Sequence, residues 1–446
     1  MRRSVPLWSR VALVLGIGTI LGLSAWNCAG AGEKPRTKVL LLGIDAADWD
    51  VIGPLLDQGK LPNLARLRDE GAAGKLRSLE PLTKSPIIWA SIATGKVPEK
   101  HGISDFFVKR AEQDRAAARR AGTGATDDAP TTSNLWRARP VWDILGSIGE
   151  SVGVVGWWTT WPAQPVNGVL VSDYVQYEFG SWPARDAQRT YPDTLDALVA
   201  KVRRSPESIS WAELFQFVPP IDTTHVTARQ QDLVHELRWM VAGDLTFHNV
   251  GLTLYRRYHP DFFTVYFRGI DAASHRYWDI DLPGQFYPQL TDREYEWLKN
   301  LIRNYYIFTD RMLGDFLREA DRGTTVIVCS DHGFGGGGKG IMAHRLDGVV
   351  FARGPGVPKG GNITGATVLD ITPTVLAEFG LPTAEDMDGR PIEDALPASV
   401  VKKLAHEKRF KTYESAATQA RSNQQPIRSP VDEELRERLR SLGYIQ

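Results

Sequence analysis

One short stretch constrains the fold of this chain more than any other. Residues 325–329 form an apolar, β-branched run, which is followed directly by Ser330, Asp331, His332 and Gly333. A run of this kind predicts a buried strand of a parallel sheet. Open α/β sheets keep their functional sites at the carboxyl ends of such strands. We therefore expect Asp331 and His332 to lie in a functional site.

Three further segments carry the same residue types. Asp45 ends one apolar run, Asp271 follows another with His275 four residues later, and His344 precedes a third. On a helix, the spacing of Asp271 and His275 places both side chains on one face. With the first segment, these residues supply three aspartates and three histidines, the ligands expected of a centre with two divalent metal ions. We expect Zn²⁺, and Mn²⁺ stays open because it accepts the same ligands.

A candidate nucleophile lies in a separate segment. Pro86 opens an apolar helical run that ends at Gly95, which predicts Ser85 as the N-cap residue of that helix. The amino-terminal end of a helix favours negative charge and can bind a phosphate group. Beside a zinc ion, the hydroxyl group of Ser85 would ionise near neutral pH and act as a nucleophile. A serine that only caps its helix is the alternative, and the metal ligands favour the catalytic interpretation.

The alternation of predicted strands and helices indicates an α/β protein with an inserted segment. The pattern runs through residues 36–178 and returns at 259–392, which we expect to form two parts of one catalytic core. Residues 179–258 show mainly helical periodicity and predict a largely helical cap. Residues 109–134 hold few large apolar residues and predict an exposed insertion, and 393–446 predict a polar tail. Strands are expected at 38–44, 152–156, 262–267 and 325–329, and helices at 61–71, 194–202, 232–255, 295–322 and 369–379.

The amino terminus predicts export. A segment with Arg2, Arg3 and Arg10 is followed by the apolar run 11–26 and by a small-x-small site that ends at Ala31, a pattern typical of a secretory signal peptide. We assign residues 1–31 to a signal peptide and expect a periplasmic, envelope or extracellular protein. Cys28 leaves a lipoprotein anchor open, and the apolar run leaves an uncleaved membrane anchor open. Membrane association through the N-terminus therefore stays an alternative.

Charge and cysteine content narrow the function further. The chain has 53 Lys and Arg residues and 53 Asp and Glu residues, so its formal net charge is zero. This balance gives no electrostatic basis for specific nucleic-acid binding. Of the two cysteines, Cys28 lies in the signal region and Cys329 lies inside the apolar run. A mature chain with one cysteine is expected to hold no internal disulfide.

Taken together, these residues resemble the type I phosphodiesterase and nucleotide pyrophosphatase family of the alkaline phosphatase superfamily. The resemblance extends over 38–108 and 139–389. It implies an alkaline-phosphatase-like central, mostly parallel sheet with helices on both faces. It also implies a first metal site formed by Asp45, Ser85, Asp331 and His332, and a second formed by Asp271, His275 and His344.

The chain departs from the family pattern around the nucleophile. The family often has threonine ahead of Phe-Pro-Asn, whereas here Ser85 is followed by Pro86, Ile87 and Ile88. The asparagine that would help to hold the phosphoryl oxygens is therefore absent. Thr83 is a rival nucleophile, although Ser85 has the matching distance to the end of the helix. The related sulfatases want Cys or Ser followed by x-Pro-x-Arg, and the absence of that pattern disfavours sulfatase chemistry.

The resulting prediction is an exported two-metal phosphodiesterase, similar to a nucleotide pyrophosphatase, that acts through a phosphoryl intermediate on Ser85. Two divalent ions would bring four positive charges to three aspartates and one alkoxide. Such a nearly neutral site suits a monoanionic phosphodiester or a phosphonate, and the family resemblance adds pyrophosphate. Two alternatives stay open. One is transfer of the phosphoryl substituent to an envelope lipid or glycan, and the other is a noncatalytic envelope binding protein on the same fold.

Overall fold

A nine-stranded sheet forms the centre of the protein. The computed structural model describes residues 37–109, 128–177, 187–280, 290–338, 340–406, 408–419 and 424–445. The strand order is β13-β2-β12-β9-β1-β8-β5-β6-β7. All of these strands except β12 and β7 run in the same direction, so the sheet is mostly parallel, as expected. Their bounds are β1 Lys38–Ile44, β2 Ala72–Arg77, β5 Val152–Val155, β6 Gly168–Val171, β7 Thr190–Tyr191, β8 Phe262–Phe267, β9 Thr324–Cys329, β12 Asp347–Arg353 and β13 Gly361–Thr367.

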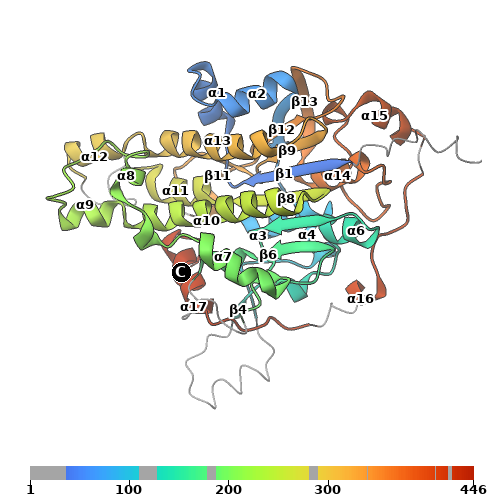
Figure 1. The fold of residues 1–446 in the computed structure, drawn as a ribbon, viewed down its shortest axis with the longest axis horizontal. Helices are drawn as coiled ribbons and strands as arrows, with labels where there is room; N and C mark the ends of the chain where they lie inside the picture. The colour runs from blue at the N-terminus through green and yellow to red at the C-terminus, as the bar shows by residue number, and fades with distance from the viewer. Residues whose placement is uncertain are drawn as a thin grey trace, which may run out of the picture. The chain divides into compact units, whose positions relative to one another are not determined.

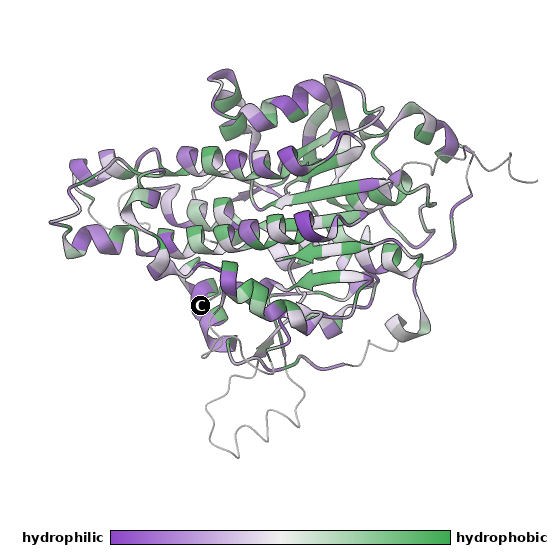
Figure 2. Ribbon diagram, in the orientation of Figure 1, coloured by the Kyte–Doolittle hydropathy of each residue, from purple (hydrophilic) through white to green (hydrophobic). Residues whose placement is uncertain are grey.

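The three central strands are the ones that the apolar runs predict. β1 pairs in parallel with β8 on one side and with β9 on the other. Every residue of β8 and β9 is buried, and this explains why both sequences are continuously apolar rather than alternating. Figure 2 shows the same hydrophobic character along the central strands. Because the three strands are parallel, their carboxyl ends meet at one edge of the sheet.

Helices cover both faces of the sheet, and alternate residues of β1 point to opposite faces. Leu40 and Leu42 belong to one hydrophobic core, whereas Val39 and Leu41 belong to the other, as the two-residue period of a strand requires. Figure 1 shows α10 and α13 crossing the face nearer to the viewer. That core includes α1 Trp49–Asp57, α2 Pro62–Glu70, α10 His235–Tyr258 and α13 Leu301–Glu319, and the opposite core includes α3 Ser85–Thr94, α6 Val141–Ser147 and α14 Ile371–Glu378.

Two predicted helices are interrupted in the structure. The helix expected over 295–322 consists of α12 Asp292–Leu298 and α13, with Asn300 preceding α13 in a non-helical backbone conformation. Asparagine favours such boundary positions because its side chain competes for backbone hydrogen bonds. The helix expected over 232–255 is α10, preceded by the short α9 Ala228–Leu233. The remaining predicted helices match α2, α7 Asp196–Val202 and α14 within a few residues.

The predicted cap residues do not all lie apart from the sheet. α10 packs on the sheet, because Phe247, Val250 and Leu254 share a core with Val265 of β8, while α7, α8 Trp211–Leu214 and α9 precede it in the chain. The division of the chain into core, cap and tail therefore stays a prediction. The signal segment 1–31 lies outside the described residues. Within the residues that are described, no helix is long and apolar enough to span a membrane.

Two segments outside the sheet approach each other. The ends of the predicted insertion form an antiparallel ribbon of β3 Phe107–Lys109 and β4 Asp128–Pro130, and residues 110–127 lie outside the described part. The tail contains α15 Ala398–Leu404, α16 Ala416–Gln419 and α17 Asp432–Ser441. Figure 1 shows α17 beside β4 and the first turns of α10. Leu435 and Leu439 of α17 are buried, so the end of the tail is packed on the protein.

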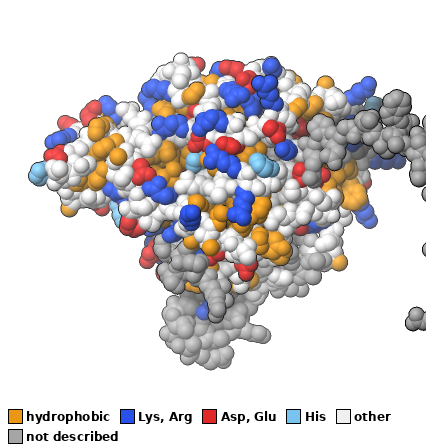
Figure 3. All heavy atoms as spheres, in the orientation of Figure 1, with side chains coloured by type: hydrophobic (Ala, Val, Ile, Leu, Met, Phe, Trp, Pro, Cys, Tyr) orange, Lys and Arg blue, Asp and Glu red, His pale blue; other side chains and the backbone are white. Residues whose placement is uncertain are grey.

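The surface in Figure 3 carries charges of both signs. Lys and Arg side chains are interspersed with Asp and Glu over the visible face. This distribution agrees with the zero net charge of the sequence.

Candidate metal centre and nucleophile

Six of the seven predicted site residues meet at the carboxyl edge of the central strands. Asp45 follows β1, and Asp331 and His332 follow β9. α11 Gly269–Tyr277 begins after β8 and carries Asp271 and His275. The sixth, His344, opens the short strand β11 His344–Arg345, which pairs with β10 Gly333–Phe334. All six side chains are at most 6% exposed.

The glycine-rich loop explains how His344 reaches His332. Gly336 and Gly337 have φ angles of +67° and +78°, a region that glycine adopts without steric cost. This turn folds β11 back on β10, so that the rings of His332 and His344 stack with centroids 3.7 Å apart. The loop thus joins the two groups of predicted ligands.

The first cluster contains three acceptor atoms that face one another. His332 Nε2 lies 3.3 Å from Asp45 Oδ1 and 3.4 Å from Asp331 Oδ2. None of these three atoms has a hydrogen-bond partner among the described residues. His332 Nδ1 lies 3.0 Å from the carbonyl oxygen of Gly333. Because a carbonyl oxygen can only accept a hydrogen bond, Nδ1 is the nitrogen that carries the proton. Because burial lowers the pKa of His332 to about 4, its imidazole is neutral at pH 7, with the Nε2 lone pair facing the carboxylates.

Each carboxylate of this cluster is oriented through its other oxygen. The hydroxyl group of Tyr266 donates to Asp45 Oδ2, and the backbone N–H of Ala46 donates to Asp331 Oδ1 over 3.3 Å. Burial, together with the nearby Asp271, raises the pKa of Asp45. Burial and the charge of Asp45 hold the pKa of Asp331 well above its usual range. Without a cation, these carboxylates therefore disfavour being ionised together.

The second cluster is more internally connected. Asp271 Oδ1 lies 3.3 Å from His275 Nε2 and 3.5 Å from His344 Nε2, and the two Nε2 atoms are 2.9 Å apart. The i, i+4 spacing on α11 thus places Asp271 and His275 together, as predicted. Burial acts to raise the pKa of Asp271, but the two histidines outweigh it and hold that pKa well below its usual range.

The two clusters adjoin at His332. Its ligand atom lies within 4.8 Å of those of Asp45 and Asp331, and it also lies within 4.8 Å of those of Asp271 and His344. His275 reaches the second group through its contacts with Asp271 and His344. This donor set of carboxylates and imidazoles fits divalent cations such as Zn²⁺ or Mn²⁺.

Ser85 is the first residue of α3, and the N-cap residue is Lys84 instead. Lys84 has an extended backbone, and its carbonyl oxygen accepts from the N–H groups of Ile87 and Ile88, which is the role of an N-cap. The predicted capping role of Ser85 is therefore wrong by one position. This leaves its Oγ buried and without a hydrogen-bond partner among the described residues. The rival Thr83 is partly exposed and precedes the helix.

The packing of α3 brings its first turns towards the first cluster. Trp89, one turn after Ser85, packs its ring edge-on against Tyr266 at a centroid distance of 5.0 Å, and Tyr266 donates to Asp45. A Cβ atom on Gly43 would lie 2.7 Å from the Trp89 ring, so the close approach requires glycine in β1. The helix is therefore packed against β1, the strand that Asp45 follows.

Two tyrosines at the site were not predicted from the sequence. Tyr266 belongs to a predicted strand, and its position next to the strand end was a usable signal. Tyr444 comes from the end of the tail, and its hydroxyl group lies 2.8 Å from Asp271 Oδ2 and 2.9 Å from His275 Nε2. Nothing in the local sequence around Tyr444 predicts this contact, because it depends on the docking of α17.

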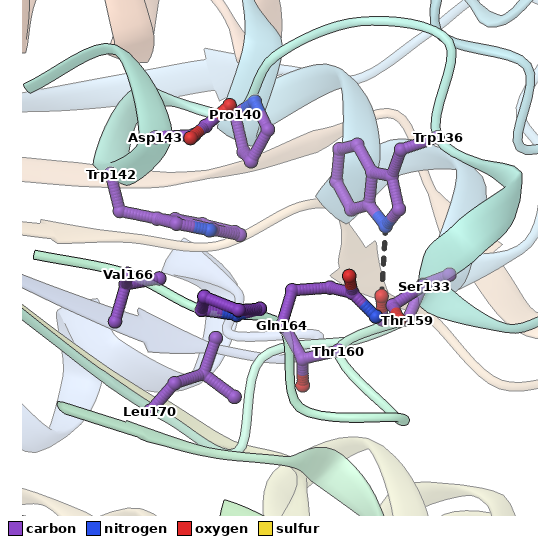
Figure 4. Close-up of a pocket in the computed structure, with 11 residues that line it drawn as sticks. Ser133, Trp136, Pro140, Trp142, Asp143, Thr159, Thr160, Gln164, Val166 and Leu170 are labelled. Atoms are coloured by element: carbon purple, nitrogen blue, oxygen red, sulfur yellow. Dashed lines mark hydrogen bonds between the residues drawn. The ribbon is translucent and has the colours of Figure 1, made fainter. Parts of the chain in front are cut away.

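A separate cavity of about 50 Å³ lies beside α6. Figure 4 shows Trp136 and Trp142 on its walls, and Trp136 Nε1 donates to the carbonyl oxygen of Thr159 over 2.8 Å. None of the seven predicted site residues lines this cavity. The clusters above are therefore assigned from their own geometry and not from this cavity.

Several solved structures are similar to the chain at low sequence identity. Phosphonoacetate hydrolase from Sinorhizobium meliloti 1021, solved with phosphonoformate, is 19% identical with a TM-score of 0.41, and the match covers 67% of this chain and 57% of that chain. Human ectonucleotide pyrophosphatase/phosphodiesterase 5 is 12% identical with a TM-score of 0.46, covering 81% and 100%. A 2-O GAG sulfatase is 12% identical with a TM-score of 0.48, covering 84% and 76%. This chain thus spans little more than half the length of the phosphonoacetate hydrolase.

The match to a family model is more extensive. No curated protein sequence matches the chain. The model described as type I phosphodiesterase / nucleotide pyrophosphatase matches residues 39–348, which is more than half of the chain and includes all seven predicted site residues. The resemblance drawn from the sequence is thereby confirmed. The chain belongs to the type I phosphodiesterase/nucleotide pyrophosphatase family.

Proposed function

We propose that the protein is an exported, metal-dependent phosphodiesterase that forms a phosphoryl intermediate on Ser85. One observation carries the proposal. Asp45 Oδ1, Asp331 Oδ2 and His332 Nε2 converge in a buried site, and none has a hydrogen-bond partner among the described residues. Buried acceptors of this kind are costly unless a cation or a donor lies between them. The family supplies the reaction class.

The donor set divides into two candidate metal sites. Asp45, Asp331 and His332, with Ser85 Oγ, would hold one divalent ion, and the second would be held by Asp271, His275 and His344. A divalent ion bound there would polarise phosphoryl oxygens and lower the pKa of a nearby hydroxyl group. Its identity as Zn²⁺ rather than Mn²⁺ is part of the proposal.

The residues of the chain hold the reacting groups in place. Tyr266 and the N–H of Ala46 fix the orientation of the first two carboxylates, and Gly333 fixes the proton of His332 on Nδ1. Ser85 Oγ attacks phosphorus as the bond to the leaving oxygen breaks, and water then hydrolyses the phosphoryl-serine. Burial of the site limits solvent access during the first step.

Export rests on the amino-terminal pattern of a basic start, an apolar run and a small-x-small site. Residues 1–31 are outside the described part of the structure. We propose removal of this segment, which leaves a mature chain that begins at Gly32. Phosphodiester, pyrophosphate and phosphonate groups are the proposed substrates.

The test is hydrolysis by the chain from Gly32 to Gln446, supplied with Zn²⁺ or Mn²⁺. The substrates are bis-p-nitrophenyl phosphate, p-nitrophenyl phosphate and p-nitrophenyl phenylphosphonate. We expect metal-dependent cleavage that prefers the diester or the phosphonate. Ser85→Ala should lower turnover by at least about 10⁴-fold, because the nucleophile is lost, and it should keep its bound metal.

The matched control is Thr83→Ala, which removes the rival hydroxyl group and should keep wild-type turnover. Unchanged turnover in Ser85→Ala would overturn the assignment of the nucleophile. Full metal loading with no hydrolysis of any of the three substrates would favour transfer to an envelope lipid or glycan. No metal and no hydrolysis would favour the binding protein.

A further inference from the structure

We propose that Tyr444, near the carboxyl end of the chain, is a fourth ligand of the second metal site. The proposal rests on the metal sites proposed above. The phenol oxygen of Tyr444 lies 2.8 Å from Asp271 Oδ2, 2.9 Å from His275 Nε2 and 3.3 Å from His344 Nε2. It therefore contacts all three predicted ligands of that site. No family pattern or motif in the sequence assigns a role to this residue.

The distances match the edges of a small coordination shell. Among the four side chains, the measured separations lie between 2.8 and 3.5 Å, with Asp271 Oδ1 facing the two histidines and Asp271 Oδ2 facing Tyr444. A tetrahedral ion with ligand distances of about 2.0 to 2.1 Å places its ligand atoms about 3.3 Å apart. The phenol oxygen thus occupies a corner of a set that can close around one ion.

The side from which Tyr444 approaches distinguishes a ligand from a supporting group. A supporting group contacts the outer nitrogen of a ligating histidine and fixes its ring. Here the outer Nδ1 atoms of His275 and His344 have no hydrogen-bond partner among the described residues. Tyr444 instead contacts the two Nε2 atoms, which also face each other and Asp271. Its oxygen is therefore on the inner side of the cluster.

Tyr266 provides an internal contrast. Its hydroxyl group donates to Asp45 Oδ2 and accepts from Trp158 Nε1 over 2.7 Å, so neither contact is with one of the facing acceptors of the first cluster. Tyr444 also contacts the second oxygen of an aspartate, Asp271 Oδ2, but in addition it contacts the inner Nε2 atoms of both histidines. The two phenols therefore have different roles, and only Tyr444 has the position of a ligand.

The docking of α17 explains how a residue so far along the chain reaches the site. The guanidinium group of Arg438 lies over the ring of Trp239 at 4.9 Å, and its Nη1 lies 3.4 Å from Glu236 Oε2. The guanidinium group of Arg436 lies over the ring of Phe107 at 4.3 Å. These contacts connect α17 to α10 and to the β3–β4 ribbon.

The last residues after α17 are also packed. Leu442 is buried, and the ring of Tyr444 lies 4.9 Å from that of Phe106. Gly443 has a φ angle of +80°, which turns the chain towards the clusters. The tail therefore presents Tyr444 from a packed segment, and Tyr444→Phe would keep the ring contacts while removing only the oxygen.

The test is calorimetric titration of Zn²⁺ into the metal-free chain from Gly32 to Gln446, with total bound zinc measured separately. We expect two zinc ions in the wild type. In Tyr444→Phe, one ion should bind as before, and the other should bind at least about 100-fold more weakly, which is the upper end of the loss that removal of a supporting residue causes. The matched control is Tyr258→Phe, because Tyr258 is exposed at the end of α10, and it should bind both ions as the wild type does.

Two further measurements separate a ligand from a structural role. Truncation after Gly443 removes the phenol and leaves α17 in place, so it should weaken the same site. Co²⁺ bound at the second site should change its visible absorption in Tyr444→Phe, because a ligand is lost. Wild-type zinc affinity in Tyr444→Phe overturns the proposal, even where the Ser85 mechanism holds. A wild type that binds fewer than two ions overturns both.

Discussion

The two clusters of the candidate site use similar residues but are built differently. The first follows the ends of two central strands, and the acceptors of Asp45, Asp331 and His332 that face one another have no hydrogen-bond partner in the part of the chain that the structure describes. The second lies on a helix and a hairpin, and its atoms contact one another and Tyr444. The two clusters shift the pKa of their aspartates in opposite directions. The pKa of Asp331 is held well above its usual range by burial and Asp45, whereas the histidines hold that of Asp271 well below it.

This contrast separates two ways of preparing a site for a cation. At the first cluster, the strand ends hold like charges together, so the metal-free protein is strained electrostatically and a cation relieves the strain. At the second cluster, histidines partly compensate the carboxylate before any cation binds. The same substitution, aspartate to asparagine, should therefore change the stability of the metal-free protein in opposite directions.

The largest effect is expected from Asp331→Asn in the first cluster. Turnover of bis-p-nitrophenyl phosphate should fall by about 10³-fold or more, because a charged ligand is lost. In chelator at pH 8, the melting temperature should instead rise, because the buried charge is removed while Oδ1 can still accept from Ala46. Hydrolysis assays and thermal unfolding measure the two effects. Asp222→Asn, at an exposed aspartate far along the chain from the site residues, is the control and should change neither.

A smaller loss of activity and the opposite change in stability are expected from Asp271→Asn. Turnover should fall by about 10²-fold, because the second cluster loses its charged ligand. The melting temperature in chelator should fall, because the carboxylate that compensates His275 and His344 is gone. Equal changes of the same sign in Asp331→Asn and Asp271→Asn would contradict the electrostatic difference between the clusters.

The same contrast shows what the sequence could predict. β1, β8 and β9 were predicted because strands buried on both faces are continuous apolar runs. The residues that follow them were then predicted to meet, since parallel strands end at one edge. β2 and β13 were not predicted. Both are rich in small and polar residues and are only partly buried, so neither shows an apolar run or a regular alternation.

The atoms of the site were harder to predict than its residues. Ser85 was expected as an N-cap. A shift of the helix start by one residue decides whether its Oγ accepts a hydrogen bond from a backbone N–H group or is left without that bond. Sequence alone does not fix the start of a helix to a single residue. Tyr444 could not be predicted, because its contacts with Asp271 and the histidines depend on how α17 docks on Trp239 and Phe107. Tertiary packing of a distant segment leaves no periodic signal near the residue that it delivers.

The smallest effect concerns the support beneath the second cluster. Asp244 Oδ1 accepts from the N–H groups of Arg268 and Gly269 at the start of α11, and Oδ2 accepts from the hydroxyl group of Tyr305. Burial raises the pKa of Asp244 from 3.8 to about 7. A raised pKa means that the folded protein binds the proton more tightly than the unfolded chain does. The stability from this group is thus complete below about pH 4 and is lost as the pH rises through 7.

Asp244→Asn keeps the shape and the acceptor oxygen but cannot ionise, so it should lack this loss. Between pH 5 and pH 8 in chelator, the wild type should lose about 2 to 4 °C of melting temperature relative to Asp244→Asn, as a change of about 2.7 kcal/mol would give in a chain of 446 residues. Thermal unfolding at several pH values measures the difference. Parallel curves would mean that Asp244 is already ionised in the folded protein at pH 5. Asp244 would then carry a negative charge beneath the second cluster. The electrostatic difference between the two clusters would in that case depend on Asp271 alone.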